Sequence, residues 1–126
     1  MKELEKLTDQ LNEMYAYCVV TYNEKDGNEL SDRVTNLNVY LARSSSLLSW
    51  AQFYYDKAQG EAAEAILTGW EQKGIKISPN VLKQLINGKT VSEAKVLKFT
   101  ERLNRTITHQ IDGIRSQLSY LKSLPQ

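Results

Sequence analysis

The densest group of polar side chains lies between Arg102 and Asp112. His109 is the single histidine; Asp112 follows it by three residues and Arg105 precedes it by four. On a helix this spacing places the three side chains on one face, where a carboxylate can orient and charge an imidazole. Hydrolysis would also need a nucleophile and an oxyanion hole. Ser116 is the one nucleophile on that face, and a smooth helix has no oxyanion hole, so these residues argue against an enzyme.

The same residues are too few for a metal centre. His109 and Asp112 would supply two ligands, whereas a protein zinc site needs three or four. Cys18 is the only cysteine, which excludes an internal disulfide and any site built from several cysteines. The sequence contains no glycine-rich phosphate loop, no Cys/His finger and no HExxH element. We therefore expect neither a metal nor a cofactor, and we interpret Cys18 as a buried structural thiol.

Anion binding is the chemistry that the charged residues fit better. Arginine offers planar pairs of donors to a phosphate, and aromatic rings can stack on a base. The candidate ligand-binding residues are Arg43, Trp50, Tyr54, Arg102, Arg105, His109 and Arg115. Two chains that share such a surface would form a symmetric nucleotide pocket. The alternative interpretation is a solvated charged face beside a buried aromatic core.

The element that must position three of these seven residues is the segment 30–69. Apolar or small residues recur through it at alternating steps of four and three, from Leu30 and Val34 to Gly69. This period is typical of a helix with one continuous seam that faces partner helices. Roughly 40 residues make a rod of about 60 Å, which is long for one compact domain. The helix therefore projects, bends near Gly60 or is held by several chains.

The outward side of this segment is apolar as well. It carries Val39, Tyr40, Leu47, Trp50, Phe53 and Tyr54. A helix that is apolar nearly all round is buried on more than one side. We therefore expect a second interface, most simply in a homodimer or larger oligomer. Ser44 interrupts the seam, which indicates either close helix packing or a polar pocket with Arg43 at its edge.

The flanking segments complete a single all-α domain over 1–126. Amphipathic spacing and capping signals predict helices over 3–23, 29–72, 79–87 and 91–123. Thr90 and Glu93 have the spacing of a capping box at the start of the last helix. Past Gly60 the seam is alanine, which indicates a close helix approach or a projecting arm. The expected architecture is an elongated, antiparallel, coiled-coil-like bundle with long central and C-terminal helices, and it is oligomeric.

Charge is distributed unevenly along the chain although the net charge is only +1. Residues 1–27 carry three bases and six acids, residues 28–74 carry four and six, and residues 75–126 carry nine and three. This pattern indicates either complementary helices in one bundle or an anion-binding C-terminal half. The sequence has no run of 18 apolar residues and no apolar signal core, so we expect a cytoplasmic protein without a membrane span.

Several motifs resemble a known group of proteins. They are Glu101–Thr106, Thr108–Asp112, Arg115–Ser119, Tyr40–Arg43 and Ala51–Tyr55. These segments are similar to small, uncharacterised helical proteins encoded by tailed phages and prophages of gut bacteria. The resemblance brings no established activity or site residues. It implies a viral accessory role in the host cytoplasm, in which such proteins commonly bind nucleotide signals, host proteins or recombination intermediates.

The leading functional hypothesis is a non-enzymatic phage accessory protein that sequesters a small anionic, nucleotide-like defence signal between helices of an oligomer. A second hypothesis is a single-stranded nucleic-acid-binding accessory of recombination or replication, motivated by the basic C-terminal half. Helix, glycine turn and helix over 81–103 loosely suggest a helix-turn-helix, but the second helix is too long. A third hypothesis is a helical adaptor that binds proteins through the apolar faces of residues 39–54.

Overall fold

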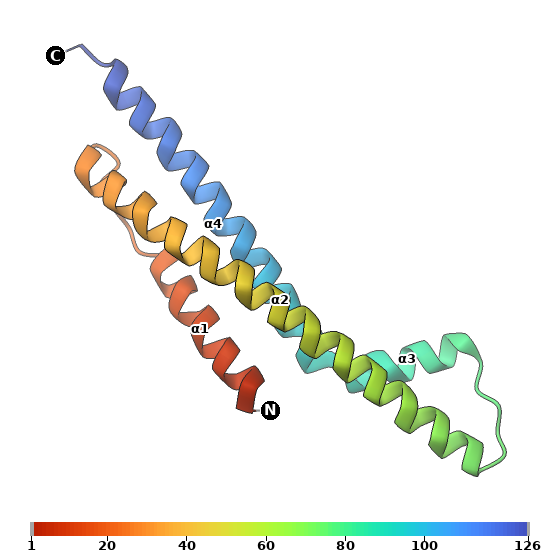
Figure 1. Ribbon diagram of the computed structural model, residues 1–126. Coiled ribbons are helices and arrows are strands. Elements are labelled where there is room, and N and C mark those ends of the chain that lie inside the picture. Colours follow the sequence, from red (N-terminus) through yellow and green to blue (C-terminus); the bar gives the residue numbers. More distant parts are fainter. Residues whose placement is uncertain (1, 126) are drawn as a thin grey trace.

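Figure 1 shows the computed structural model, which describes residues 2–125 as four helices with no strand among them. The helices are α1 (Lys2–Cys18), α2 (Gly27–Gln72), α3 (Pro79–Lys89) and α4 (Val91–Ser123). The prediction of an all-α fold is confirmed. Among the described residues, no helix combines the length and apolar character needed to cross a membrane.

The helices α1 and α4 pack against the first half of α2. In Figure 1, α2 runs antiparallel to both α1 and α4, and α1 and α4 run parallel to each other. The most extensive helix pair is α2 with α4, while α3 packs against the far end of α2. The molecule is therefore an elongated bundle that has three helices at one end and two at the other.

The helix α1 ends at Cys18, so the prediction that it continues to residue 23 is wrong. Arg33 Nη2 donates to the carbonyl oxygens of Tyr17 at 3.1 Å and Cys18 at 3.2 Å. Gln110 Nε2 donates to the same Cys18 oxygen at 2.8 Å. These side chains from α2 and α4 satisfy carbonyls that a longer helix would have bonded internally, so the chain can leave the helix there.

Capping residues define both ends of α2. The Asp26 carboxylate accepts from the backbone N–H of Asn28 at 3.0 Å and of Glu29 at 3.2 Å. At the other end, Gly74 has a φ of 68°, which glycine adopts without steric cost. The Ile75 N–H then reaches back to an earlier helix carbonyl, as in a Schellman motif. Between these caps, α2 is a continuous helix and does not break near Gly60.

The junction between α3 and α4 differs from the predicted capping box. Ser78 Oγ accepts from the Val81 N–H at 3.3 Å and caps α3 as expected. Thr90, however, makes no side-chain cap to α4. Its hydroxyl donates instead to the Ile86 carbonyl of α3 at 3.0 Å. The capping-box prediction is wrong because the fully buried Thr90 hydroxyl completes the last turn of the preceding helix.

The core is built from aliphatic side chains of all three larger helices. The buried apolar residues packed in it are Leu7, Leu11, Met14, Cys18, Leu30, Leu37, Leu47, Ala51, Leu97, Leu103, Ile107, Ile111 and Ile114. Ser44 is fully buried within it and accepts a 2.9 Å hydrogen bond from Asn104 Nδ2. Ser44 thus allows close packing of α2 on α4, whereas the Arg43 guanidinium lies 5.6 Å from the ring centre of Tyr40. The close-packing interpretation of Ser44 fits this geometry.

Candidate functional site

The aromatic candidates lie together on α2. The rings of Trp50 and Tyr54 stack with centroids 5.9 Å apart, and Phe53 meets both rings edge-on. Trp50 is 53% exposed and Phe53 is 51% exposed. We call Trp50, Phe53 and Tyr54 the aromatic surface. It forms because helical spacings of one, three and four residues bring these rings side by side on a helix face that α1 covers only in part.

Four of the five basic candidates lie on a different element, α4, and do not join this surface. Arg102, Arg105, His109 and Arg115 are all exposed along α4. The hollows that Trp50 and Tyr54 line are completed by residues of α1 and α2 and by Glu93, and none of the α4 arginines takes part. Within one chain, the four basic residues of α4 are therefore separate from Trp50 and Tyr54. Arg43, the seventh predicted ligand-binding residue, lies on α2, where its guanidinium is 5.6 Å from the ring centre of Tyr40.

The two hollows beside the aromatic surface differ in charge. One hollow of about 200 Å³ lies between α1 and α2, against Trp50 and Tyr54. A second, of about 180 Å³, is lined by Tyr54, Lys57, Glu61 and Glu93 among others. Lys57 lies 3.9 Å from Glu61, and the buried Oε2 of Glu93 has no hydrogen-bond partner among the described residues. The carboxylates of the second hollow outnumber its single lysine and would repel a phosphate, so this hollow suits a cationic group better. The first hollow has one acid and one base, Glu3 and Lys6, beside Leu7, Leu47 and the two rings, and it suits an apolar group.

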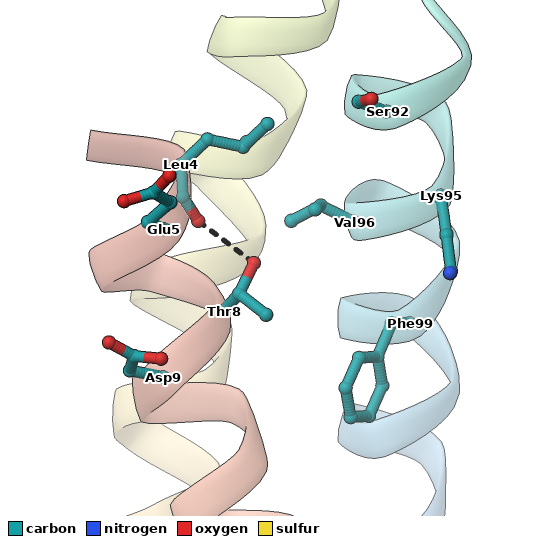
Figure 2. Close-up of a pocket in the computed structure, with 8 residues that line it drawn as sticks. All are labelled: Leu4, Glu5, Thr8, Asp9, Ser92, Lys95, Val96 and Phe99. Atoms are coloured by element: carbon teal, nitrogen blue, oxygen red, sulfur yellow. Dashed lines mark hydrogen bonds between the residues drawn. The ribbon is translucent and has the colours of Figure 1, made fainter. Parts of the chain in front are cut away.

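A third hollow lies between α1 and α4, and Figure 2 shows it in close-up. This α1–α4 groove has a volume of about 320 Å³ and is lined by Leu4, Glu5, Thr8, Asp9, Ser92, Lys95, Val96 and Phe99. Its middle is apolar, with Leu4 and Phe99 in view, and the Thr8 hydroxyl is bonded to the Leu4 carbonyl at 2.8 Å. Sequence reasoning missed this groove. The available signal was that Phe99 lies at the flank of its helix's apolar stripe.

A buried arginine was also missed. Arg33 is only 5% exposed, and its guanidinium lies 4.7 Å from the ring centre of Tyr17 and 4.4 Å from that of Tyr22. Its Nε has no hydrogen-bond partner among the described residues. The sequence signal is weak: Arg33 precedes Val34 of the predicted seam, so it lies at the edge of the face that packs. Its contacts make it a positioning group for the end of α1.

The thiol beside Arg33 is unsuited to nucleophilic chemistry. Cys18 is 5% exposed. Burial raises the pKa of its thiol above the ordinary value, and the positive charge of Arg33 opposes part of that rise. Because the thiolate is the reactive form, a raised pKa lowers the reactivity of this cysteine. Burial also limits access to the sulfur.

Comparison of the chain with family models, with curated proteins and with solved structures finds no match.

Proposed function

We propose that this protein is a non-enzymatic helical adaptor that binds a protein partner through the aromatic surface of α2. The observation that carries the proposal is that Trp50 and Phe53 remain half exposed while contacting each other and Tyr54. Rigid aromatic side chains that expose large apolar area are the usual anchors of protein interfaces. In the viral role that the resemblance implies, the partner is a host or phage protein.

The hollows next to the aromatic surface indicate the chemistry of that partner. An apolar side chain of the partner fits the 200 Å³ hollow against Trp50. A lysine or arginine fits the second hollow, where a buried oxygen of the Glu93 carboxylate has no hydrogen-bond partner within residues 2–125. A cation there would also face Glu61, and it could stack on the exposed rings. The partner segment we expect is therefore amphipathic, with an aliphatic anchor and a basic residue close to it.

The rest of the fold supports such a role by holding α2 in place. Leu37 of α2 and Leu11 of α1 are fully buried in the three-helix core. This packing fixes the position of α2 and of the face that it exposes. A preorganised surface loses less conformational entropy on binding than a flexible one. The aromatic surface is thus positioned by packing, which is what an adaptor needs.

The test starts with a photo-crosslinking amino acid at position 53, which identifies the protein that touches this surface in cells. Its affinity for the purified chain is then measured by calorimetry. Trp50→Ala should weaken binding by about 30-fold or more, the effect of removing an interface anchor worth about 2 kcal/mol. Tyr120→Ala, which removes an equally exposed ring from α4, is the matched control and should leave the affinity unchanged. Equal affinities for both variants would refute the proposal.

A second candidate is the sequestration of a small anionic, nucleotide-like ligand between the helices of an oligomer. The supporting observation is that Arg102, Arg105 and His109 are exposed together along α4. A second copy would have to bring this basic row against Trp50 and Tyr54 of the first. Native mass spectrometry of the protein from a defence-competent host should then show an oligomer with a retained nucleotide-sized mass. Arg105→Ala should lose that mass and keep the oligomer.

A nucleic-acid-binding role rests on the same basic row, extended by Lys95 and Lys98, which are also exposed. Binding of this kind releases counterions, so affinity for single-stranded DNA should fall steeply as salt concentration rises. A mobility-shift titration at several salt concentrations measures this slope. No retardation of the DNA at low salt would exclude this candidate.

A further inference from the structure

The α1–α4 groove is one face of the bundle, and none of the four described helices covers it. Its two helices stay in register along their length. At one end, Gln110 donates a hydrogen bond to the Cys18 carbonyl, and at the other end Val96 and Leu4 both line the groove. In each pair the two residues are 92 positions apart in the sequence. A parallel pair in constant register offers a straight surface to another helix pair.

The middle of this face is apolar and incompletely covered. Val96 of α4 points across the groove toward α1 near Leu4, and Phe99 lines the groove further along α4 (Figure 2). Tyr15 meets Phe99 edge-on with ring centroids 6.1 Å apart, yet it remains 51% exposed. Val19, one helical turn beyond, is 59% exposed. The apolar strip thus continues along α1 and past its end.

The two edges of the face carry opposite charges. Glu5 and Asp9 are exposed on the α1 side, and Lys95 is exposed on the α4 side. Arg102 is also exposed and follows Lys95 by two helical turns, so it extends the basic edge. Because α1 and α4 are aligned in this register, the acidic pair Glu5 and Asp9 lies at the same level along the helix axes as the basic pair Lys95 and Arg102. The acidic edge and the basic edge therefore run side by side, with the apolar strip between them.

Such a surface is complementary to itself under one particular symmetry. A twofold axis parallel to the helices places α1 of one copy over α4 of the other at the same height, so that acid faces base. An axis perpendicular to the helices would instead place Glu5 and Asp9 against the same residues of the other copy. Like charges then oppose each other, which disfavours that arrangement.

We propose that a second copy of this chain docks on the α1–α4 groove about a twofold axis parallel to the helices. The apolar strips meet at the centre, and two sets of acid–base pairs flank them. A face about 25 Å long and two helices wide buries on the order of 500 Å² per copy, which is at the lower limit for a specific interface. The dimer is therefore weak and reversible, and it dissociates more readily at high salt.

Reversal of the charges tests this geometry directly. The acid-reversed chain carries Glu5→Lys and Asp9→Lys, and the base-reversed chain carries Lys95→Glu and Arg102→Glu. Each alone opposes like charges and should dimerise at least about tenfold more weakly than the natural chain. When the acid-reversed and base-reversed chains are mixed, acidic side chains of one chain face basic side chains of the other at both edges. A heterodimer should therefore form. A chain with all four substitutions should again form a homodimer.

Sedimentation over a wide concentration range measures each association, and circular dichroism confirms that every variant keeps its helices. The control carries Asp32→Lys and Glu64→Lys, two exposed acids of α2 outside the groove, and it should dimerise like the natural chain. Three results overturn the proposal: a natural chain that stays monomeric to about 1 mM, a dimer insensitive to both reversals, or two reversed chains that fail to rescue each other. If the dimer were insensitive to both charge reversals but lost in Trp50→Ala, the dimer interface would be the aromatic surface and not the α1–α4 groove.

Discussion

The two ends of the molecule differ in how completely the side chains of α2 are buried. In the three-helix section, formed by α1, α4 and the first half of α2, side chains such as Leu11, Leu37 and Ile107 are completely buried. In the arm, formed by residues 55–72 of α2 and by α3, only Ala62 and Ile66 of α2 are buried, and no residue of α3 is. Two helices in contact leave most of each surface in water, so a closed core requires a third helix.

This difference predicts where stability resides. Helices gain most of their stability from the packing of an apolar face, because an isolated helix is marginal in water. Within α2 and α3, the arm buries only the side chains of Ala62 and Ile66, and Leu67, Val81 and Leu85 stay partly exposed. Hydrogen exchange should therefore show the arm opening with a lower free energy than the three-helix section.

The largest effect expected is the loss of a core leucine. Leu37→Ala should reduce the free energy of unfolding by about 2–5 kcal/mol, because the cavity lies among three helices that cannot all move in to fill it. Leu85→Ala in α3 removes a side chain that is already 37% exposed and should cost less than about 1 kcal/mol. Urea unfolding followed by circular dichroism measures both. Similar costs would show that the arm is packed as tightly as the three-helix section.

A smaller effect is expected at the buried arginine. Arg33→Met keeps most of the volume and removes the donors to the Tyr17 and Cys18 carbonyls, which should cost about 1–3 kcal/mol. Arg43→Met, on the same helix but not buried, should cost less than about 0.5 kcal/mol. Urea unfolding gives both values, and hydrogen exchange should show earlier opening at the end of α1. Equal costs would mean that Arg33 does not hold α1 in place.

Glycine substitutions should sharpen the comparison within the arm. Gly60→Ala should stabilise the protein by about 0.5–1 kcal/mol, because a Cβ there meets open space and alanine favours the helix. Gly74→Ala should destabilise by about 1 kcal/mol, because the φ of 68° strains an L side chain. Thermal unfolding measures both changes. Loss of stability in Gly60→Ala would indicate that the arm requires a bend that the continuous helix does not show.

The smallest effect concerns alkaline pH. Burial raises the pKa of the Cys18 thiol in the folded protein, so the unfolded chain loses this proton at a lower pH. The stabilising contribution is fully present below the pKa of the unfolded thiol and is lost as pH rises through the folded pKa. The natural chain should thus lose more stability between about pH 8 and pH 10 than Cys18→Ala does. Parallel pH profiles for the two chains would contradict a buried neutral thiol.

Local pattern predicted the helices well where a cap or an uninterrupted seam was present. The expected spans 29–72 and 91–123 lie within two residues of α2 and α4. The two errors have different causes. Arg33 and Gln110, which are distant in the sequence, bond to the Cys18 carbonyl where α1 ends, and the spacing of nearby residues does not show this. At Thr90 two local hydrogen bonds compete, and the hydroxyl donates to the Ile86 carbonyl of α3 instead of capping α4.

The candidate sites divide in the same way. The aromatic surface could be expected from sequence because Trp50, Phe53 and Tyr54 are close in one helix. The α1–α4 groove could not, because it joins Leu4 to Val96 across the whole chain. The separation of the α4 arginines from Trp50 likewise depends on how the helices pack. Whether residues on two helices share one site depends on how those helices pack against each other.

By itself the amino-acid sequence determined that this chain is helical, because the periodicity of its apolar residues and its capping residues act over a few neighbouring positions. It also determined which side chains α2 presents on one face. Tertiary structure alone decided that Arg33 is buried, that α1 stops at Cys18 and that a charged-edged groove opens beside α4. These features depend on contacts between residues far apart in the sequence, and the local periodicity of apolar residues carries no information about such contacts.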